Sequence, residues 1–114
     1  MNYTWEQFDT DCKKIVQFVE RKRVECDSVY GLPRGGLCLA VKLSHLLHIP
    51  LASEEQITKK TLIVDDISDS GVTLHKFRKN FIVTLFYHKN TITKPDFTCN
   101  EKEDKWIVFP WEVE

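Results

Sequence analysis

A short apolar run that ends abruptly in acidic residues constrains the fold of this chain more than any other feature. Residues 61–64 read TLIV, and Asp65, Asp66 and Asp69 follow within the next five positions. A strand that is apolar on both faces is typical of a parallel sheet covered on both sides. The run therefore predicts a strand over residues 61–64 inside an α/β sheet, with an acidic carboxyl end.

The segments around this run alternate between helical and strand patterns. Apolar residues at helical spacing, with the capping pair Thr4 and Gln7, predict a helix over residues 4–23. The other expected elements are helices at 37–47 and 71–79, strands at 28–32, 50–52, 81–87 and 106–111, and polar loops at 53–60 and 89–104. This alternation predicts one domain over residues 1–114, of minimal size, with a doubly wound, mostly parallel α/β sheet.

Composition argues against several classes of protein. Lys+Arg number 16 and Asp+Glu 17, and a net charge of −1 is unlike that of a general nucleic-acid or membrane-surface binder. The first residues lack the basic and apolar regions of a signal peptide, and the four cysteines form no CxxC pair. We therefore expect a cytoplasmic protein with reduced thiols and with neither nucleic-acid nor membrane partners.

The residues after the apolar strand suit a phosphorylated sugar. In an open parallel sheet, ligands bind beyond the carboxyl ends of the strands, where Asp65 and Asp66 are expected. The turn 69–73 reads DSGVT and leads into the predicted helix, where free backbone N–H groups attract an anion. Carboxylates can accept hydrogen bonds from sugar hydroxyls or help to hold a hard cation. Two adjacent aspartates alone would favour a strand end with N-capping aspartates and no ligand, but the whole stretch favours the ligand site.

Four stretches resemble motifs of the type I phosphoribosyltransferases. TLIVDDISDSGVT at 61–73 resembles their ribose-phosphate signature, and YGLPRGG at 30–36 resembles their pyrophosphate-binding loop. VTLFYHK at 83–89 resembles the strand before the base pocket, and WIVFPWE at 106–112 resembles the C-terminal end of the xanthine–guanine (purine) members. Ser68 stands where the family usually has an aliphatic residue. The resemblance covers nearly the whole chain after Cys26 and implies the family's fold.

The resemblance implies an activity, a cofactor and partners. The family transfers a 5-phosphoribosyl group from phosphoribosyl pyrophosphate to a nucleobase nitrogen with Mg²⁺, and its purine members make nucleoside monophosphates in purine salvage. We expect this transfer to a 6-oxopurine base, by a homodimer. The alternative is a non-catalytic regulatory protein that binds phosphoribosyl pyrophosphate or a nucleotide. A carboxylate-rich magnesium phosphatase fits less well, because the turn after the carboxylates suits phosphate binding.

The resemblance also implies roles for single residues. Asp69 is the candidate general base, and Arg34 is the catalytic cation that meets the pyrophosphate together with Gly35. Asp65 and Asp66 would bind the ribose hydroxyls, and Asp66 would also partner the magnesium shell. The expected contacts of the 5′-phosphate are Ser70, Gly71, Val72 and Thr73.

The expected base pocket departs from the family at one position. The purine members have a lysine that donates to the exocyclic oxygen of a 6-oxopurine, and gap-free alignment from Val83 places His88 there. Lys89 follows one residue later, and either side chain can donate a hydrogen bond. Both therefore remain candidates. Trp106 would stack on the base, and the backbone of Ile107 would read its edge.

The connection before the signature strand is short. Family members carry a long flexible loop there, which closes over the active site, whereas residues 52–60 number only nine. A connection of that length cannot make a full lid, so water should enter during the transfer unless a partner subunit supplies cover. Lys59 and Lys60 either reach the pyrophosphate from this loop or remain solvated.

Overall fold

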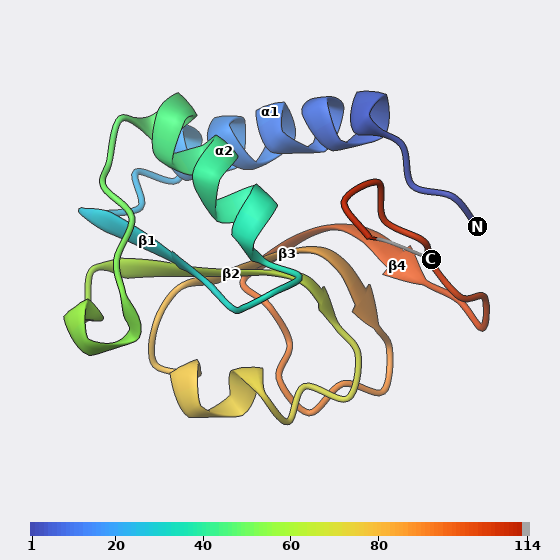
Figure 1. The fold of residues 1–114 in the computed structure, drawn as a ribbon. Helices are drawn as coiled ribbons and strands as arrows, with labels where there is room; N and C mark the ends of the chain where they lie inside the picture. The colour runs from blue at the N-terminus through green and yellow to red at the C-terminus, as the bar shows by residue number, and fades with distance from the viewer. Residues whose placement is uncertain (113–114) are drawn as a thin grey trace.

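Four parallel strands form the sheet, in the order β1-β2-β3-β4. The computed structural model describes residues 1–112, and its strands are β1 (Ser28–Gly31), β2 (Thr61–Ser68), β3 (Ile82–His88) and β4 (Phe97–Lys102). Because all neighbouring pairs run parallel, the four carboxyl ends lie at one edge of the sheet (Figure 1). The predicted α/β class with a parallel sheet is confirmed.

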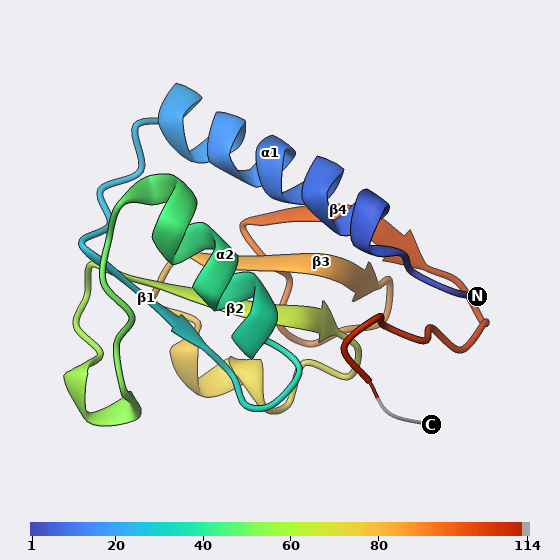
Figure 2. The same ribbon diagram turned by 45° about the horizontal axis from the view of Figure 1, so that its top comes forward.

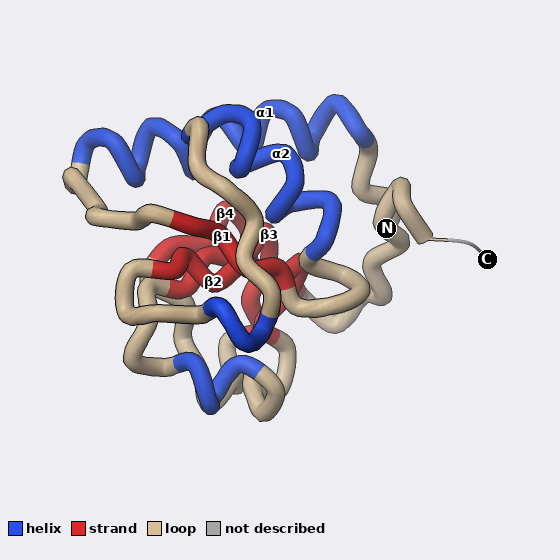
Figure 3. The backbone as a smooth tube through the Cα atoms, turned by 60° about the vertical axis from the view of Figure 1, so that its left-hand side comes forward, coloured by secondary structure: helices blue, strands red, loops and turns tan. Residues whose placement is uncertain are grey.

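Helices cover both faces of this sheet, but unequally. The two long helices, α1 (Trp5–Arg21) and α2 (Leu37–Leu47), share one face, where α2 packs on β1 and β2 and α1 packs on β4 (Figure 2). The other face carries the short 3-10 helix η2 (Leu74–Phe77), on the far side of the strands from the long helices (Figure 3). None of the helices within residues 1–112 combines the length and apolar character needed to cross a bilayer.

Alternate residues of β2 enter two different hydrophobic cores. Leu62 and Val64 belong to the larger core under α1 and α2, whereas Ile63 belongs to a smaller core that includes Leu74 and Phe77 of η2. Successive side chains of a strand point to opposite faces, so a strand between two cores must be apolar throughout. This explains the uninterrupted run from which the sheet was predicted.

The helix starts follow the sequence signals, with one exception. The predicted capping box forms, because the Gln7 N–H donates to Thr4 Oγ1 at 3.1 Å and the Thr4 N–H donates to Gln7 Oε1 at 2.9 Å. The helix predicted over residues 71–79 is only η2. Leu74 and Phe77 are three residues apart and both buried, which satisfies a 3-10 turn of three residues as well as an α-helix.

Two expectations for the C-terminal third of the chain are wrong. The predicted polar loop 89–104 contains β4, whose Phe97 stacks on Phe18 of α1 with 4.3 Å between ring centroids. The predicted strand 106–111 is an extended segment that makes a single bridge, between Val108 and Asn2. Phe109 and Trp111 of this segment stack on each other, and Pro110 has no N–H to donate to a ladder.

Two other strands differ in length from the prediction. β2 continues to Ser68, four residues beyond the expected end at Val64, because its pairing with β3 extends to Ser68 and Tyr87. The strand predicted over residues 50–52 is reduced to an isolated bridge between Leu51 and Val29.

The connection between α2 and β2 is folded at the amino edge of the sheet. It contains a second 3-10 helix, η1 (Glu54–Gln56), near the start of β2 and away from the strand arrowheads (Figure 1). The Lys76 ammonium pairs with the Glu54 carboxylate at 2.9 Å, and the Asn80 amide donates to the Thr58 carbonyl at 2.8 Å. Residues 52–60 are therefore tied down and leave the carboxyl edge uncovered.

A buried carboxylate joins the N-terminal segment to α1 and β4. Asp11 is only 5% exposed, and its Oδ2 accepts hydrogen bonds from the Tyr3 hydroxyl at 2.6 Å and from the Asn100 amide at 2.9 Å. Since buried charges are stable only when their hydrogen bonds are made, these contacts fix how the three segments pack.

Tyr3→Phe should lower the free energy of unfolding by about 1–3 kcal/mol, because it removes a donor from the buried Asp11 carboxylate. Chemical denaturation followed by circular dichroism measures the change. The matched control is Tyr87→Phe, which removes a surface hydrogen bond of 3.0 Å to Glu101 and should leave the unfolding midpoint nearly unchanged. Equal effects of the two variants would contradict this role of the buried carboxylate.

Candidate functional site

The candidate site lies where β1 ends while its neighbour β2 continues. Gly31 is the last residue of β1 and pairs with Val64, so the remainder of β2 has only β3 beside it. Asp65 and Asp66 lie in this half-paired part of β2, inside the strand and not beyond its end as the sequence suggested. The loop 33–36 turns into the space that the missing neighbour leaves.

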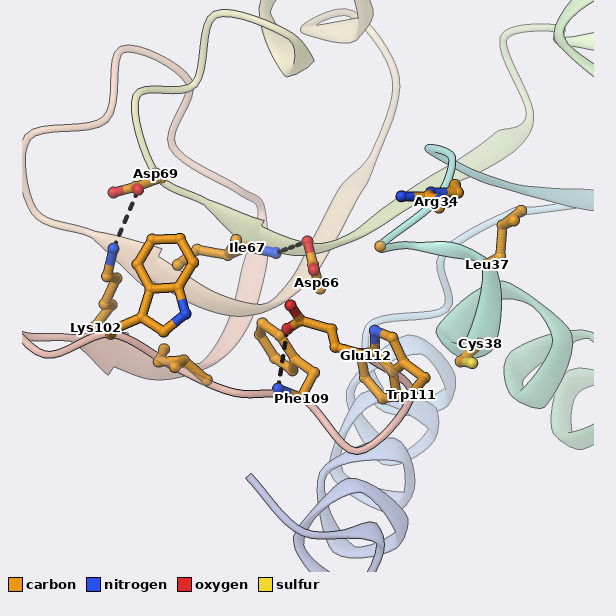
Figure 4. A pocket seen from close by; sticks show the side chains of 13 residues that line it. Arg34, Leu37, Cys38, Asp66, Ile67, Asp69, Lys102, Phe109, Trp111 and Glu112 are labelled. Atoms are coloured by element: carbon orange, nitrogen blue, oxygen red, sulfur yellow. Dashed lines mark hydrogen bonds and ion pairs between the residues drawn. The ribbon is translucent and has the colours of Figure 1, made fainter. Parts of the chain in front are cut away.

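Glycine is required where that loop meets β2. A β-carbon at Gly35 would overlap the Oδ2 of Asp66, and one at Gly36 would lie 2.7 Å from the carbonyl oxygen of Val64. The peptide between Pro33 and Arg34 in the same loop is cis. The two glycines therefore bring the Arg34 loop and the Asp66 carboxylate into direct contact (Figure 4).

The two adjacent carboxyl groups of β2 are hard to ionise together. Burial, with the charge of Asp66 beside it, raises the pKa of Asp65 to about 8. Burial also raises the pKa of Asp66, although hydrogen bonds from Asp65 and from the Ile67 N–H at 2.8 Å oppose that shift. At neutral pH the pair thus holds a proton in the free protein, which a cation or a hydrogen-bonding ligand would displace or use.

An open cavity of about 700 Å³ lies at the carboxyl edge of the sheet. Its walls come from the loop after β1, from β2, from the end of β4 and from the C-terminal segment (Figure 4). Six of the residues predicted from the sequence line it: Arg34, Gly35, Asp66, Asp69, Trp106 and Ile107. The structure therefore brings residues of three of the four stretches, 30–36, 61–73 and 106–112, into one space.

The remaining predicted residues lie outside the walls of this cavity: Asp65, Ser70, Gly71, Val72, Thr73, His88 and Lys89. Asp65 directly adjoins it, because its Oδ1 accepts a hydrogen bond from the Asp66 N–H at 2.9 Å. Lys60 stands at the opposite edge of the sheet and pairs with Glu25 at 3.8 Å. That position favours the solvated alternative for Lys60 over contact with a ligand in the cavity.

The predicted phosphate turn is fixed by hydrogen bonds from the connection between β3 and β4. The Thr93 hydroxyl donates to the Gly71 carbonyl at 2.6 Å, and Gly71 has a φ of +82°, which favours glycine. Ser68 is buried, and its hydroxyl lies 2.7 Å from the Thr91 hydroxyl and donates to the Thr93 carbonyl at 2.8 Å. The polar residue that departs from the family pattern therefore ties this turn to its neighbour.

Lys102 is a cavity residue that the sequence analysis missed. It is the last residue of β4, its Nζ lies 3.2 Å from Asp69 Oδ2, and it sits over the Trp106 ring at 5.7 Å from the centroid (Figure 4). The signal for it was weak, because the alternation of Phe97 and Cys99 with polar residues is short. β4 is also an edge strand, which permits polar residues on its outer side.

The C-terminal segment is anchored by aromatic rings and presents a second missed residue. Phe109 and Trp111 stack at 5.1 Å with 12° between their planes, and the Phe109 N–H donates to the Glu112 carboxylate at 3.0 Å. Glu112 and Asp66 point toward one another across the cavity (Figure 4), and the charge of Glu112 contributes to the raised pKa of Asp66. The indole N–H of Trp111 is buried without a partner in residues 1–112.

The carboxylates of Asp65 and Asp66 suit a cation that is bound jointly by the protein and a substrate. They suit a metal site made of protein side chains alone less well. Among the described residues, no group of three or more His, Cys, Asp or Glu side chains is placed to hold a metal ion. Mg²⁺ commonly binds one or two carboxylates together with the phosphates of a substrate, and Asp66 beside the Arg34 loop offers such a position.

Comparisons with known proteins agree on a fold and a family. No protein-family model matches the chain. A purine phosphoribosyltransferase of known structure from Pyrococcus horikoshii is 30% identical, with a TM-score of 0.86 over all of this chain and 95% of its own. The xanthine-guanine-hypoxanthine phosphoribosyltransferase of Helicobacter pylori shares the fold, with a TM-score of 0.84 at 24% identity over 98% of this chain and 92% of its own.

A curated relative gives the same result from sequence. The xanthine-guanine phosphoribosyltransferase of Gluconobacter oxydans is 25% identical over 139 aligned positions, which include 96% of this chain and 83% of the relative. The alignment is longer than the 114 residues of this chain, so the relative carries residues with no counterpart here.

Asp65→Asn should stabilise the protein increasingly as the pH rises. In the folded state Asp65 keeps a proton that the unfolded chain releases above its ordinary value of 3.8, so the wild type loses stability between about pH 4 and about pH 8. Asparagine cannot ionise, and it keeps an oxygen that can accept from the Asp66 N–H. Relative to the wild type, we expect the free energy of unfolding of Asp65→Asn to rise by nearly zero at about pH 4. At about pH 8 we expect a rise above about 1.4 kcal/mol, the equivalent of one pKa unit.

Denaturant titrations at several pH values measure this gain. Asp104→Asn is the matched control, because Asp104 is exposed and lies outside the cavity. A gain for Asp65→Asn that does not change with pH would contradict the raised pKa.

Proposed function

Because the chain belongs to the purine phosphoribosyltransferase family of enzymes, we propose that it transfers the 5-phosphoribosyl group of phosphoribosyl pyrophosphate to a 6-oxopurine base. The products are a nucleoside monophosphate and pyrophosphate, and the reaction serves purine salvage in the cytoplasm. The observation that carries the proposal is the single cavity that joins Arg34, Asp66, Asp69 and Trp106.

The charges of the cavity suit the two ends of the sugar substrate. Arg34 offers a planar fork of donors to the departing pyrophosphate, whose close approach Gly35 permits. Asp66, supported by Asp65, accepts hydrogen bonds from the ribose hydroxyls. The 5′-phosphate binds the turn 70–73 through the hydroxyls of Ser70 and Thr73 and the N–H groups of Gly71 and Val72.

The base binds at the other end of the cavity. Trp106 is 74% exposed and offers a free ring face for stacking, and the backbone of Ile107 reads the base edge. A base nitrogen forms the new bond to the sugar carbon as the bond from that carbon to pyrophosphate breaks. Asp69 accepts the proton that the base gives up, which is the role of a general base.

Magnesium is the cofactor of the proposed reaction. Asp66 would hold it together with oxygens of the substrate, and the bound ion supplies charge that stabilises the departing pyrophosphate. The contact between Gly35 and Asp66 keeps that carboxylate beside the loop that meets the pyrophosphate.

We further propose a homodimer, as the family resemblance implies. Trp5, Leu37 and Val41 are large apolar side chains that remain exposed on α1 and α2. They line an apolar groove beside the cavity, with Leu37 and Cys38 belonging to both. A second copy would remove this patch from water, and sedimentation velocity measures whether the mass is that of two chains.

The test of the activity mixes the pure protein with phosphoribosyl pyrophosphate, Mg²⁺ and guanine, xanthine, hypoxanthine, adenine or uracil. We expect nucleotide and pyrophosphate in equal amounts from one or more of the first three bases. Chromatography follows the nucleotide, and a coupled assay follows the pyrophosphate. Absence of nucleotide from every base would refute the proposal.

Asp69→Asn should lower kcat by about 10² or more, because the general base is lost while the shape of the side chain is kept. Arg34→Ala should also abolish most of the activity. Asp104→Asn provides the control for the loss of one surface carboxylate and should keep the wild-type rate. Unchanged rates in both site variants would remove the roles assigned to Asp69 and Arg34.

A regulatory protein that binds phosphoribosyl pyrophosphate or a nucleotide without turnover is the second candidate. It is favoured by the nine-residue connection at the amino edge, which leaves the cavity open. Calorimetric binding of phosphoribosyl pyrophosphate with no product from any base would support it. Turnover of roughly one per second or more would exclude it.

A further inference from the structure

Lys102 is held inside the cavity and is not a free surface lysine. Only 16% of its side chain is exposed, whereas lysine is among the residues that are least often buried. Its ammonium group lies between the Asp69 carboxylate, at 3.2 Å, and the ring of Trp106, whose centroid is 5.7 Å away. A half-buried lysine that contacts two other residues of the cavity is placed to contact whatever occupies it.

The two side chains that sequence alignment favours for the base edge lie elsewhere. Neither His88 nor Lys89 lines the cavity. His88 Nδ1 accepts a hydrogen bond from the Asn90 N–H at 3.1 Å, and Lys89 is exposed. His88 of β3 is the register partner of Lys102 on β4, so the two positions lie side by side at the carboxyl edge. A lysine is therefore present at this level of the sheet, but on the neighbouring strand.

The chemistry of the pair defines what it can recognise. A lysine ammonium only donates hydrogen bonds, and an ionised carboxylate only accepts them. Lys102 and Asp69 thus present a donor beside an acceptor, 3.2 Å apart, next to a ring on which a planar ligand can stack. The matching ligand edge has a carbonyl oxygen beside the nitrogen whose proton is lost, as the oxygen at position 6 and the nitrogen at position 7 of a 6-oxopurine base provide. A 6-aminopurine presents a donor where Lys102 needs an acceptor.

We propose that Lys102 is the residue by which this protein selects a 6-oxopurine over a 6-aminopurine, in place of His88 or Lys89. This inference rests on the proposed function, because it assigns the substrate preference of the same cavity. A purely structural ion pair between Lys102 and Asp69 makes a different prediction. Its loss would weaken the binding of both kinds of purine to the same extent.

Equilibrium binding tests the inference without the need for turnover. Isothermal titration calorimetry compares inosine monophosphate with adenosine monophosphate, which differ at position 6 of the base. The variants are Lys102→Met, which keeps the length and the apolar stem, and Lys102→Gln, whose amide can both donate and accept. Lys105→Met is the matched control, since Lys105 is exposed and lies outside the cavity. Thermal melts establish that each variant is folded.

We expect Lys102→Met to weaken the binding of inosine monophosphate about tenfold to one-hundredfold, which is the effect of losing a hydrogen bond from a charged donor. The affinity for adenosine monophosphate should change far less. Lys102→Gln should bring the two affinities close together, because its carbonyl oxygen accepts from the 6-amino group. Lys105→Met should keep the wild-type preference. The inference would be overturned if Lys102→Met lowered the affinity for both nucleotides equally and Lys102→Gln kept the preference for inosine monophosphate.

The outcome separates this inference from the proposed activity. A wild type that makes nucleotide, with a preference that survives both Lys102 substitutions, refutes the role of Lys102 and leaves the activity standing. A wild type that makes no nucleotide, but loses its preference for inosine monophosphate in the Lys102 variants, refutes the activity and supports the role of Lys102. Loss of the preference in His88→Ala or Lys89→Met, and not in the Lys102 variants, would return the role to one of those residues.

Discussion

The early end of β1 at Gly31 is the constraint on which the rest of the site depends. Because β2 continues beyond its last β1 partner, one side of its final residues has no strand beside it. A loop must fill that space, and it can do so only with glycines, since β-carbons at positions 35 and 36 would meet Asp66 and the Val64 carbonyl. The same gap places a flexible cation, Arg34, beside a half-buried acidic pair.

The cavity beyond this gap has two ends of different chemistry, and packing far from it keeps them in place. One end combines Arg34 with Asp66, which suits charged phosphates and sugar hydroxyls. The other combines Lys102, Asp69 and Trp106, which suits a flat polar ring. The stack of Phe109 on Trp111 holds the C-terminal segment, and the side chain of Trp106 remains exposed beside Lys102.

Local signals predicted the parts of the fold that local interactions determine. The Thr4 capping box and the apolar helices were predictable because each is decided within a few residues of sequence. The run at 61–64 revealed a covered parallel sheet for the same reason. β4 was missed because its inner face has few apolar residues and its pairing with β3 joins segments that are distant in sequence. The C-terminal segment looked like a strand, yet its neighbour is the N-terminal bridge residue Asn2.

The residues of the site divide in the same way, into those that local sequence reveals and those that only the packing of distant segments brings to the cavity. Asp66, Asp69 and Arg34 were predictable because each lies in a short motif of consecutive residues. Lys102 and Glu112 were not, because they reach the cavity only through the folding of β4 and of the segment after it. Pairing between strands cannot be read from either residue's neighbours. The predicted α-helix after Gly71 failed for a related reason, since burial of Leu74 and Phe77 is met by a single 3-10 turn.

The tethered connection of residues 52–60 has a consequence for the order in which ligands arrive. In the proposed transfer through an activated sugar, residues 52–60 cannot keep competing nucleophiles out of the cavity by closing over it. Under the proposed function, the stacked base itself would fill the space between Trp106 and the sugar. The yield of nucleotide relative to hydrolysed sugar phosphate then depends on base being present before the sugar–pyrophosphate bond weakens. Occupancy by the acceptor would then take over the task that the resemblance assigns to a mobile lid in other members of the family.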